Sequence, residues 1–392
     1  MSKRRRNIGS FLFIIVLCLF FVTKLYRDVL GGTDFQGGIW NICQLLFVVA
    51  GYLTFFTQYP IKQNNKAISV INLFITFSFY IFGLSLITNQ SWTVYDVFSL
   101  LLVPYGSLVL IISYCYGRKN LIDDNKLLSL LIITFFVLAI LFHRGMAMSR
   151  NLIFEDVSLV ASVYYILCIV PIVLAIIPGK WKLLPFLVLA LVLLVSGKRA
   201  GMIAFVLSVL VYWNGGNSKE KKWINFIFLC IIVLVVVYAL PYIDSMYELK
   251  TIDRINSLEK DGGSGRNVRW LACINAIANS NFVELVFGHG MGAAWRDFEG
   301  EIHNDFLSVF YEYGIFAFIL YVVFYVKLFW IWLKMRREKY RHEKEFLMTW
   351  IYSMTLAMFS FFIIEPTYIT ASMFCFGMFM ADWMQSKNTV QC

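Results

Sequence analysis

Long apolar stretches alternate with short polar connections along almost the whole chain. A helix needs about 20 apolar residues to cross a bilayer, and most of the stretches approach or exceed that length. They cover residues 10–23, 39–59, 67–88, 97–116, 127–142, 157–177, 181–195, 200–213, 223–240, 304–333, 346–364 and 368–385. Because hydrocarbon offers no water to backbone groups, these spans are expected to be helices. The pattern predicts an all-α polytopic membrane protein with about 12 transmembrane helices.

One polar segment, residues 241–302, is much longer than the other connections and joins the ninth and tenth predicted spans. Trp270, Cys273 and Ile277 recur in it at helical spacing, which predicts short helices within the segment. We therefore expect one transmembrane domain, residues 1–392, that carries one long loop.

Composition and charge fix the class and the orientation. Sixty per cent of the residues are apolar and the mean hydropathy is +0.72, whereas about half apolar is usual in soluble domains. Basic residues are retained on the cytoplasmic side, and alternate connections place 21 of the 34 Lys and Arg residues on one face and 12 on the other. Both termini are therefore expected to be cytoplasmic and the long loop to lie outside. The net charge of +10 then predicts membrane lipids, and no nucleic acid, as partners.

Two neighbouring spans, 181–195 and 200–213, are short and share a turn that contains Lys198 and Arg199. Helices of this length reach only about 21 to 23 Å of a hydrocarbon core of about 30 Å. The turn is thus expected at or below the outer headgroups. The two cations then either face a functional site or extend to lipid phosphates, and position alone leaves both interpretations open.

The long loop carries two further basic candidates, Arg266 and Arg269. They are three residues apart, so they can share a helix face and reach one anion. An ordinary basic helix on the membrane surface is the alternative. The glycines around His289, from Gly288 to Gly292, permit close backbone approach to a ligand. A dinucleotide loop would need a preceding strand, and we reject it.

The loop ends at His303, beside the start of the next helix, with Asn304 or Asp305 as the predicted N-cap. The positive end of a helix favours phosphate or carboxylate. Asp305, Ser308 and Glu312 form a polar stripe that is expected to face a cavity or another helix. Glu365, at the outer end of a later pair of spans, is another carboxylate candidate.

These residue types suggest one chemistry. A neutral imidazole can act as a general base, and neighbouring arginines favour that neutral form by like charge. Forked guanidinium donors suit a diphosphate leaving group and need no metal. The candidates are Lys198, Arg199, Arg266, Arg269, Arg296, His289 and His303. Together they suggest transfer from a lipid diphosphate, although a lone histidine at a helix mouth is more often a structural hydrogen-bonder. No zinc-protease motif occurs.

The ordered motifs resemble those of the bacterial O-antigen ligase and Wzy-type polymerase superfamily. The resemblance covers residues 180–385 and rests on Ser196-Gly197-Lys198-Arg199-Ala200, Ser264-Gly265-Arg266 with Trp270, Gly288-His289-Gly290-Met291-Gly292, His303-Asn304 and Gly314. It implies a GT-C-like fold and action on undecaprenyl-diphosphate-linked glycans at the outer face of the bacterial inner membrane. It implies no nucleotide sugar, divalent metal or other cofactor, and a polysaccharide chain-length regulator is a candidate partner.

Carried over by position, the resemblance makes His303 the general base and Arg199 and Arg266 the catalytic arginines. Lys198 departs from the commoner Ser-Arg form and leaves open which of the two cations touches phosphate. The residues expected to contact substrate are Lys198, Arg269, His289, Arg296, Asn304, Glu312 and Glu365.

We expect a polymerase of lipid-linked repeat units. A ligase that transfers finished glycan to lipid A core or protein is the rival within the class, since donor and leaving group are shared. A transporter of the lipid-linked unit fits 12 spans equally well, but transporters place polar residues near the bilayer midplane and show related halves.

Overall fold

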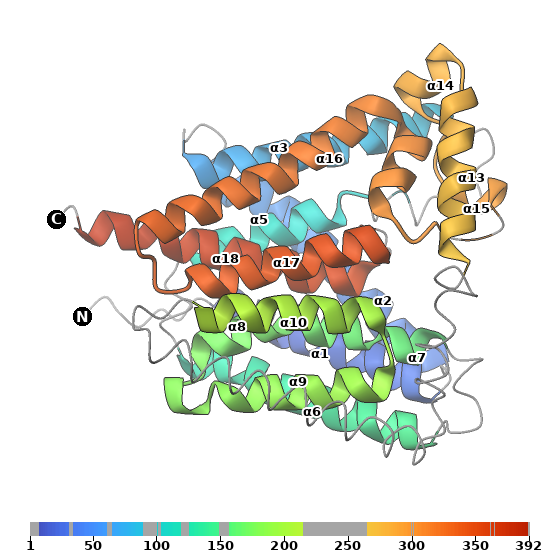
Figure 1. The fold of residues 1–392 in the computed structure, drawn as a ribbon. Coiled ribbons are helices and arrows are strands. Elements are labelled where there is room, and N and C mark those ends of the chain that lie inside the picture. Colours follow the sequence, from blue (N-terminus) through green and yellow to red (C-terminus); the bar gives the residue numbers. More distant parts are fainter. Residues whose placement is uncertain are drawn as a thin grey trace. The chain divides into compact units, whose positions relative to one another are not determined.

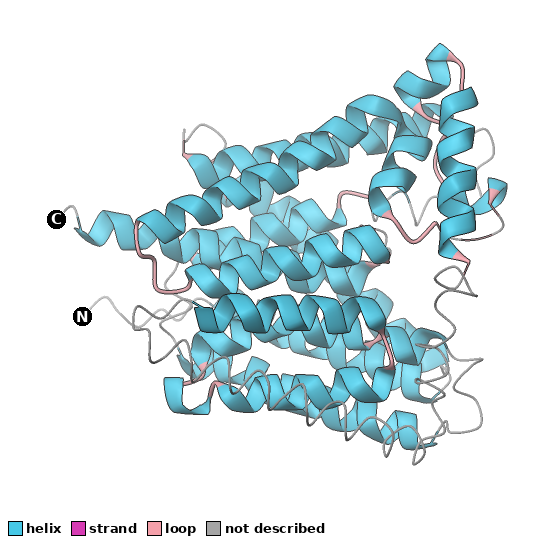
Figure 2. Cartoon of the chain, in the orientation of Figure 1, coloured by secondary structure: helices cyan, strands magenta, loops and turns pink. Residues whose placement is uncertain are grey.

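The computed structural model describes residues 8–30, 34–60, 65–88, 100, 103–118, 125–148, 157–214, 265–298, 300, 302–360, 362–363 and 365–390. All regular elements in these ranges are helices (Figure 2). The all-α prediction is therefore confirmed for the described part of the chain. The helices divide into two units, which are described separately.

Unit 1 comprises residues 1–46, 116–256 and 344–352. Its helices are α1 (Ile8–Leu30), the first part of α2 (Asp34–Gln58), α6 (Asn125–Met148), α7 (Val157–Ala161), α8 (Val163–Ile176), the 3₁₀ turn η1 (Gly179–Trp181), α9 (Leu183–Ser196), α10 (Arg199–Asn214) and the middle of α17 (Glu343–Phe359). Helix α6 packs against α1, α8 and α9 (Figure 1). Helix α8 is apolar all round, which is the pattern of a helix covered on every side, and its residues from Val163 to Leu174 are all buried.

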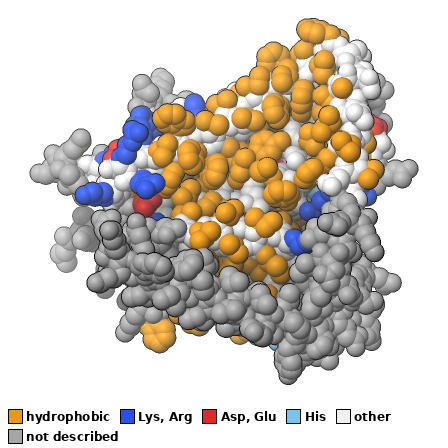
Figure 3. All heavy atoms as spheres, viewed as in Figure 1, with side chains coloured by type: hydrophobic (Ala, Val, Ile, Leu, Met, Phe, Trp, Pro, Cys, Tyr) orange, Lys and Arg blue, Asp and Glu red, His pale blue; other side chains and the backbone are white. Residues whose placement is uncertain are grey.

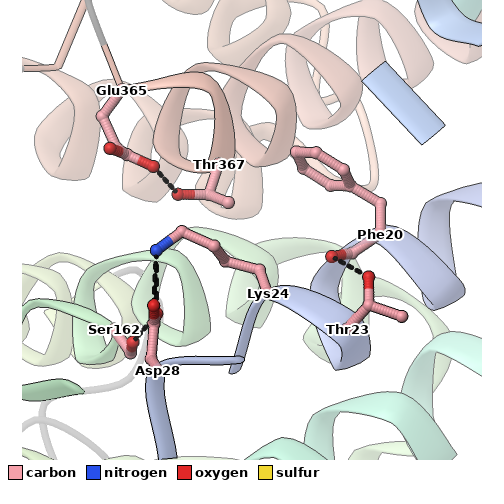
Figure 4. A network of polar contacts seen from close by, with 7 residues as sticks. All are labelled: Phe20, Thr23, Lys24, Asp28, Ser162, Glu365 and Thr367. Carbon is pink, nitrogen blue, oxygen red and sulfur yellow. Dashed lines mark hydrogen bonds and ion pairs between the residues drawn. The ribbon is translucent and has the colours of Figure 1, made fainter. Parts of the chain in front are cut away.

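A buried ion pair on α1 is hydrogen-bonded to the start of α8 (Figure 4). On α1, the Lys24 ammonium lies 2.7 Å from the Asp28 carboxylate, and Ser162, at the start of α8, donates its hydroxyl to the same carboxylate at 2.7 Å. A charge removed from water needs such partners. The network therefore fixes α1 against α8.

Unit 2 comprises residues 47–115, 257–343 and 353–392. Its helices are the rest of α2, α3 (Lys66–Thr88), α5 (Tyr105–Gly117), α13 (Arg266–Asn279), α14 (Phe282–Phe287), α15 (Ala293–Asp297), α16 (Asp305–Arg337), both ends of α17, and α18 (Pro366–Val390). Helix α16 packs along α3, with Phe74 stacked on Phe324 at 4.3 Å between ring centroids. The short helices α13, α14 and α15 all pack against α16 (Figure 1).

Six described helical stretches are long and apolar enough to cross a membrane. They are Gly9–Val29, Gly38–Gln58, Lys66–Thr88, Leu128–Ala147, Leu159–Ile176 and Asp305–Arg337. The protein is thus a multi-pass membrane protein, but the count of 12 spans is not confirmed. The predicted span 223–240 lies outside the described residues. Helices α9 and α10 are 14 and 16 residues long and stay short, as the sequence predicted.

Candidate functional site

The start of α16 holds the candidate base His303 in an unusual backbone conformation. His303 has φ of 55°, in the left-handed region that residues other than glycine rarely adopt. Hydrogen bonds hold both of its neighbours. Trp270 donates its indole N–H to the carbonyl of Ile302 at 2.8 Å, and the Asn304 side chain accepts from the backbone N–H of Leu307 at 3.1 Å. Strained residues persist only where the surroundings over-determine them, which is common at active sites.

Asn304 is therefore the N-cap of α16, which decides between the two residues that the sequence left open. Asp305 has a different task. Its buried carboxylate accepts the backbone N–H groups of Phe362 at 3.1 Å and Ile363 at 2.8 Å, and the hydroxyl of Tyr321 at 2.9 Å. These three donors supply the bonds that a buried carboxylate requires. Asp305 thus ties the turn between α17 and α18 to the start of α16.

Helix α13 lies beside this start because one of its faces is apolar. Cys273 is fully buried in a cluster with Ala293, Ala294, Ile302 and Tyr311. Burial is the main cause, and the nearby Glu312 carboxylate a lesser one, of a rise in the pKa of the Cys273 thiol to about 12. The sequence pattern that predicted a helix here reflects this packing. Its buried side faces α15 and α16.

The two loop arginines reach different backbone segments. Arg266, the first residue of α13, donates from Nη1 to the carbonyl of Phe359 at 2.8 Å, at the end of α17. The guanidinium of Arg269 lies beside Gly300, whose added Cβ would stand 3.4 Å from Nη2. Arg266 thus approaches the same turn that Asp305 holds. Both arginines are half-buried, and both lie in unit 2 with His303.

The glycine-rich segment packs against a break in α16. Gly314 has φ of 76° and ψ of −176°, which interrupts the helix. Opposite the break, His289 and Gly290 donate their backbone N–H groups to the carbonyls of Tyr311 and Glu312, both at 2.9 Å. The close backbone approach that the glycines were expected to allow is thus made to α16 of the same chain.

The carboxylate of Glu312, a residue of α16, lies at the start of α15. Its side chain accepts the backbone N–H of Ala294 at 3.2 Å, and a helix start is favourable for such a carboxylate. Arg296, exposed on α15, donates to the Met291 carbonyl at 3.0 Å. The two carboxylates of the polar stripe on α16 thus bind backbone N–H groups, Asp305 those of the α17–α18 turn and Glu312 that of Ala294 on α15.

His289 makes contacts that hold the loop together. Its Nε2 lies 2.9 Å from the Ser280 hydroxyl, and its ring stacks on Tyr311 at 4.2 Å between centroids. Tyr311 in turn donates its hydroxyl to Asp297 at 2.6 Å. Substrate binding by His289 stays a prediction, but the structure shows what the ring does within the fold.

Lys198 and Arg199 belong to unit 1. Gly197, with φ of 61°, ends α9 in the left-handed conformation that glycine adopts without strain. The Lys198 ammonium lies 6.0 Å from the Tyr164 ring centroid, and the half-buried Arg199 begins α10. The expected turn between two short helices is present, while its pairing with the loop stays a prediction.

The last candidate, Glu365, directly precedes α18 and accepts the Thr367 hydroxyl at 2.6 Å (Figure 4). In the described residues, no group of three or more His, Cys, Asp or Glu side chains is placed to hold a metal ion. Sequence reasoning placed Asp305 in a polar stripe but missed its bonds to the α17–α18 turn. The only local signal was its position directly after the cap residue.

The fold defines a helical multi-pass membrane protein. The candidate residues of unit 2 lie between the start of α13 and the first turns of α16, apart from Glu365, which directly precedes α18. Residues 184–322 match the family model described as O-antigen ligase, which confirms the resemblance to the O-antigen ligase and Wzy-type polymerase superfamily over that range. The matched range contains every candidate residue except Glu365. No curated protein matches the chain. The family match supports a membrane enzyme of the ligase or polymerase type.

Proposed function

We propose that the protein polymerises undecaprenyl-diphosphate-linked oligosaccharide repeat units into O-antigen or capsular polysaccharide at the outer face of the cytoplasmic membrane. The acceptor hydroxyl of one lipid-linked unit attacks the anomeric carbon of the growing chain. A new glycosidic bond forms, the bond from that carbon to the diphosphate oxygen breaks, and undecaprenyl diphosphate leaves.

In this reaction His303 takes the proton of the acceptor hydroxyl. Arg199 and Arg266 hold the diphosphate, whose negative charge grows as the bond breaks, and such pre-placed donors lower the barrier. The other candidates for substrate contacts are Lys198, Arg269, His289, Arg296, Asn304, Glu312 and Glu365. The observation that carries the proposal is the strained His303, held at the start of α16 between two hydrogen-bonded neighbours in the same unit as Arg266.

The test replaces His303 by Ala in a strain that depends on this protein for surface polymer. We expect the variant to reach the membrane in normal amounts while the surface glycan falls to single repeats. His143→Ala, an exposed histidine on α6, is the matched control and should leave long polymer unchanged. Normal polymer length in the His303→Ala strain would refute the role.

A ligase is the second candidate, because the matching family model is described as O-antigen ligase. Deleting the gene separates the two. A polymerase deletion leaves surface glycan capped with one repeat, whereas a ligase deletion leaves uncapped core and accumulates lipid-linked polymer. An assay with purified protein distinguishes the proposed enzyme from a transporter. The enzyme should elongate glycan when lipid-linked substrate is supplied from one side only, whereas a transporter should not.

A further inference from the structure

The outward side of α14 is apolar although it lies in the polar loop. Phe282 is 80% exposed, Val283 62% and Phe287 45%. Singly exposed apolar residues are ordinary, but a contiguous apolar patch marks a contact with another molecule or with lipid. The exposed side chains of Phe282, Val283 and Phe287 thus form a surface of the kind that another molecule or lipid covers.

The patch continues onto a surface that faces the membrane. Along α16, Phe316, Ile319, Val326 and Trp330 are each about half exposed at helical spacing, as on a lipid-facing helix side. The last turn of α14 meets α16 at Gly314, where an added Cβ would stand 2.7 Å from the backbone nitrogen of Phe287. Hydrophobic side chains are spread over most of the face of unit 2 seen in Figure 3, with polar and backbone atoms between them.

The length of α16 gives the depth of this junction. Basic residues end the helix from Lys334 onward and mark one headgroup region. Gly314 lies 20 residues before Lys334, a distance of about 30 Å along a helix, which equals the hydrocarbon thickness. Any tilt of α16 shortens that distance across the bilayer and places Gly314 deeper. The end of α14 thus lies at or within the opposite boundary of the hydrocarbon.

Helix α14 is also built to enter a region with little water. The Asn281 side chain accepts the N–H groups of Val283 at 2.9 Å and Glu284 at 3.0 Å, and Glu284 accepts the N–H of Asn281 at 2.9 Å. This capping box supplies partners for backbone groups that would otherwise need water. Glu284 is the only charged residue of the helix, and it is used in the cap.

We propose that α14 is embedded in the lipid leaflet opposite the basic end of α16, with Phe282, Val283 and Phe287 among the lipid chains. By the predicted orientation this is the outer leaflet. The occupant of the patch is phospholipid, because the patch is continuous with the lipid-facing side of α16. The proposal does not depend on the reaction proposed above.

The test attaches an environment-sensitive nitrobenzoxadiazole probe to Phe282→Cys in the full-length protein in phospholipid nanodiscs. Phe316→Cys, on the membrane-facing side of α16, is the lipid control, and Arg337→Cys, exposed in the basic end, is the water control. The unsubstituted protein gives the background labelling of native cysteines. Val283→Cys replaces Phe282→Cys if that variant does not run as a single species on gel filtration.

We expect the probe at 282 to match the probe at 316: blue-shifted emission, loss of emission with spin-labelled lipid, and no loss with iodide. A probe at 282 that behaves like the one at 337, quenched by iodide and not by lipid, overturns the proposal. Protection from both quenchers also overturns it, because a second copy of the chain would then cover the patch.

Discussion

His303 combines a functional prediction with a backbone cost. A side chain held at positive φ costs of order 1 kcal/mol or more, and glycine carries almost none of that cost. The hydrogen bonds of its two neighbours, Ile302 and Asn304, would keep the conformation in a variant without the ring. Function and stability should therefore separate at this residue.

We predict that the free energy of unfolding of His303→Gly equals that of His303→Ala or exceeds it by up to about 1 kcal/mol. Both variants should lose polymer formation. The difference is measured by heating the purified proteins in the same detergent and recording, by gel filtration, the temperature at which half of each protein is lost. His143→Gly against His143→Ala is the control pair, and there glycine should be the less stable residue because α6 is helical. A His303→Gly protein clearly less stable than His303→Ala would contradict the strain argument.

Cys273 offers a pH-dependent test of the loop core. A pKa of about 12 keeps the thiol protonated at ordinary pH, and the thiolate is the reactive form. We predict very slow labelling by N-ethylmaleimide at pH 8, with a rate that still rises about tenfold per pH unit up to pH 10. A thiol introduced by Asn275→Cys, at an exposed position two residues further along α13, should label fast, with a rate that levels off above pH 9. Equal rates for the two thiols would show that the cluster is not closed.

At the scale of elements, α14 and α16 meet through glycine backbones. An added Cβ on Gly288 would overlap the carbonyl group of Glu312, and one on Gly314 would overlap that of Val286. Both glycines also have φ near 76°. Because the opposing atoms are backbone, neither site can accept a side chain by a rotamer change.

We predict that Gly288→Ala and Gly314→Ala each destabilise the protein by about 2 to 3 kcal/mol. Gly83→Ala is the matched control: Gly83 lies in α3, and an added Cβ there meets nothing within 4 Å. That variant should be neutral or slightly more stable. The midpoint of thermal aggregation compares the three proteins, and near-identical midpoints would argue against the α14–α16 contact.

Hydropathy predicted most of the helices but not the break in α16. The start of α16 at Asp305 differs by one residue from the predicted span, and the ends of α9 and α10 lie within two residues of those predicted. A glycine inside an apolar run gives no local sign of a break, and the backbone that packs against Gly314, near Val286, is distant in sequence. The α17–α18 turn bound by Asp305 was hidden for the same reason.

At the scale of the whole molecule, the predicted span count depended on apolar runs alone. Helix α18 was one of the twelve, yet it contains Asp382, which accepts from the Tyr340 hydroxyl at 2.7 Å and pairs with Arg341 at 3.0 Å. The buried carboxylate of Asp382 thus has its hydrogen-bond and ion-pair partners inside unit 2. Composition alone cannot distinguish such a buried, paired carboxylate from an exposed one. Sequence therefore identifies the membrane class more securely than the number of spans.

The two arginines proposed to hold the diphosphate can be tested for a shared task. We predict that Arg199→Ala and Arg266→Ala each lower kcat/KM about 100-fold, and that the double variant loses clearly less than the product of the two. Arg199→Ala combined with Arg336→Ala, at the basic end of α16, is the control and should be additive. Elongation of lipid-linked substrate by purified protein provides the rates. Full additivity of Arg199 and Arg266 would mean that they do not hold one diphosphate.

The bond between Asp305 and the α17–α18 turn bears on the order in which the protein is made. The two N–H groups that Asp305 accepts lie 57 and 58 residues later in the chain. During synthesis the start of α16 therefore emerges well before its partners exist. The conformation around His303 cannot be completed until the ribosome has passed Ile363. Nascent and prematurely ended chains would carry the histidine but not its setting, which delays activity until the membrane domain is nearly whole.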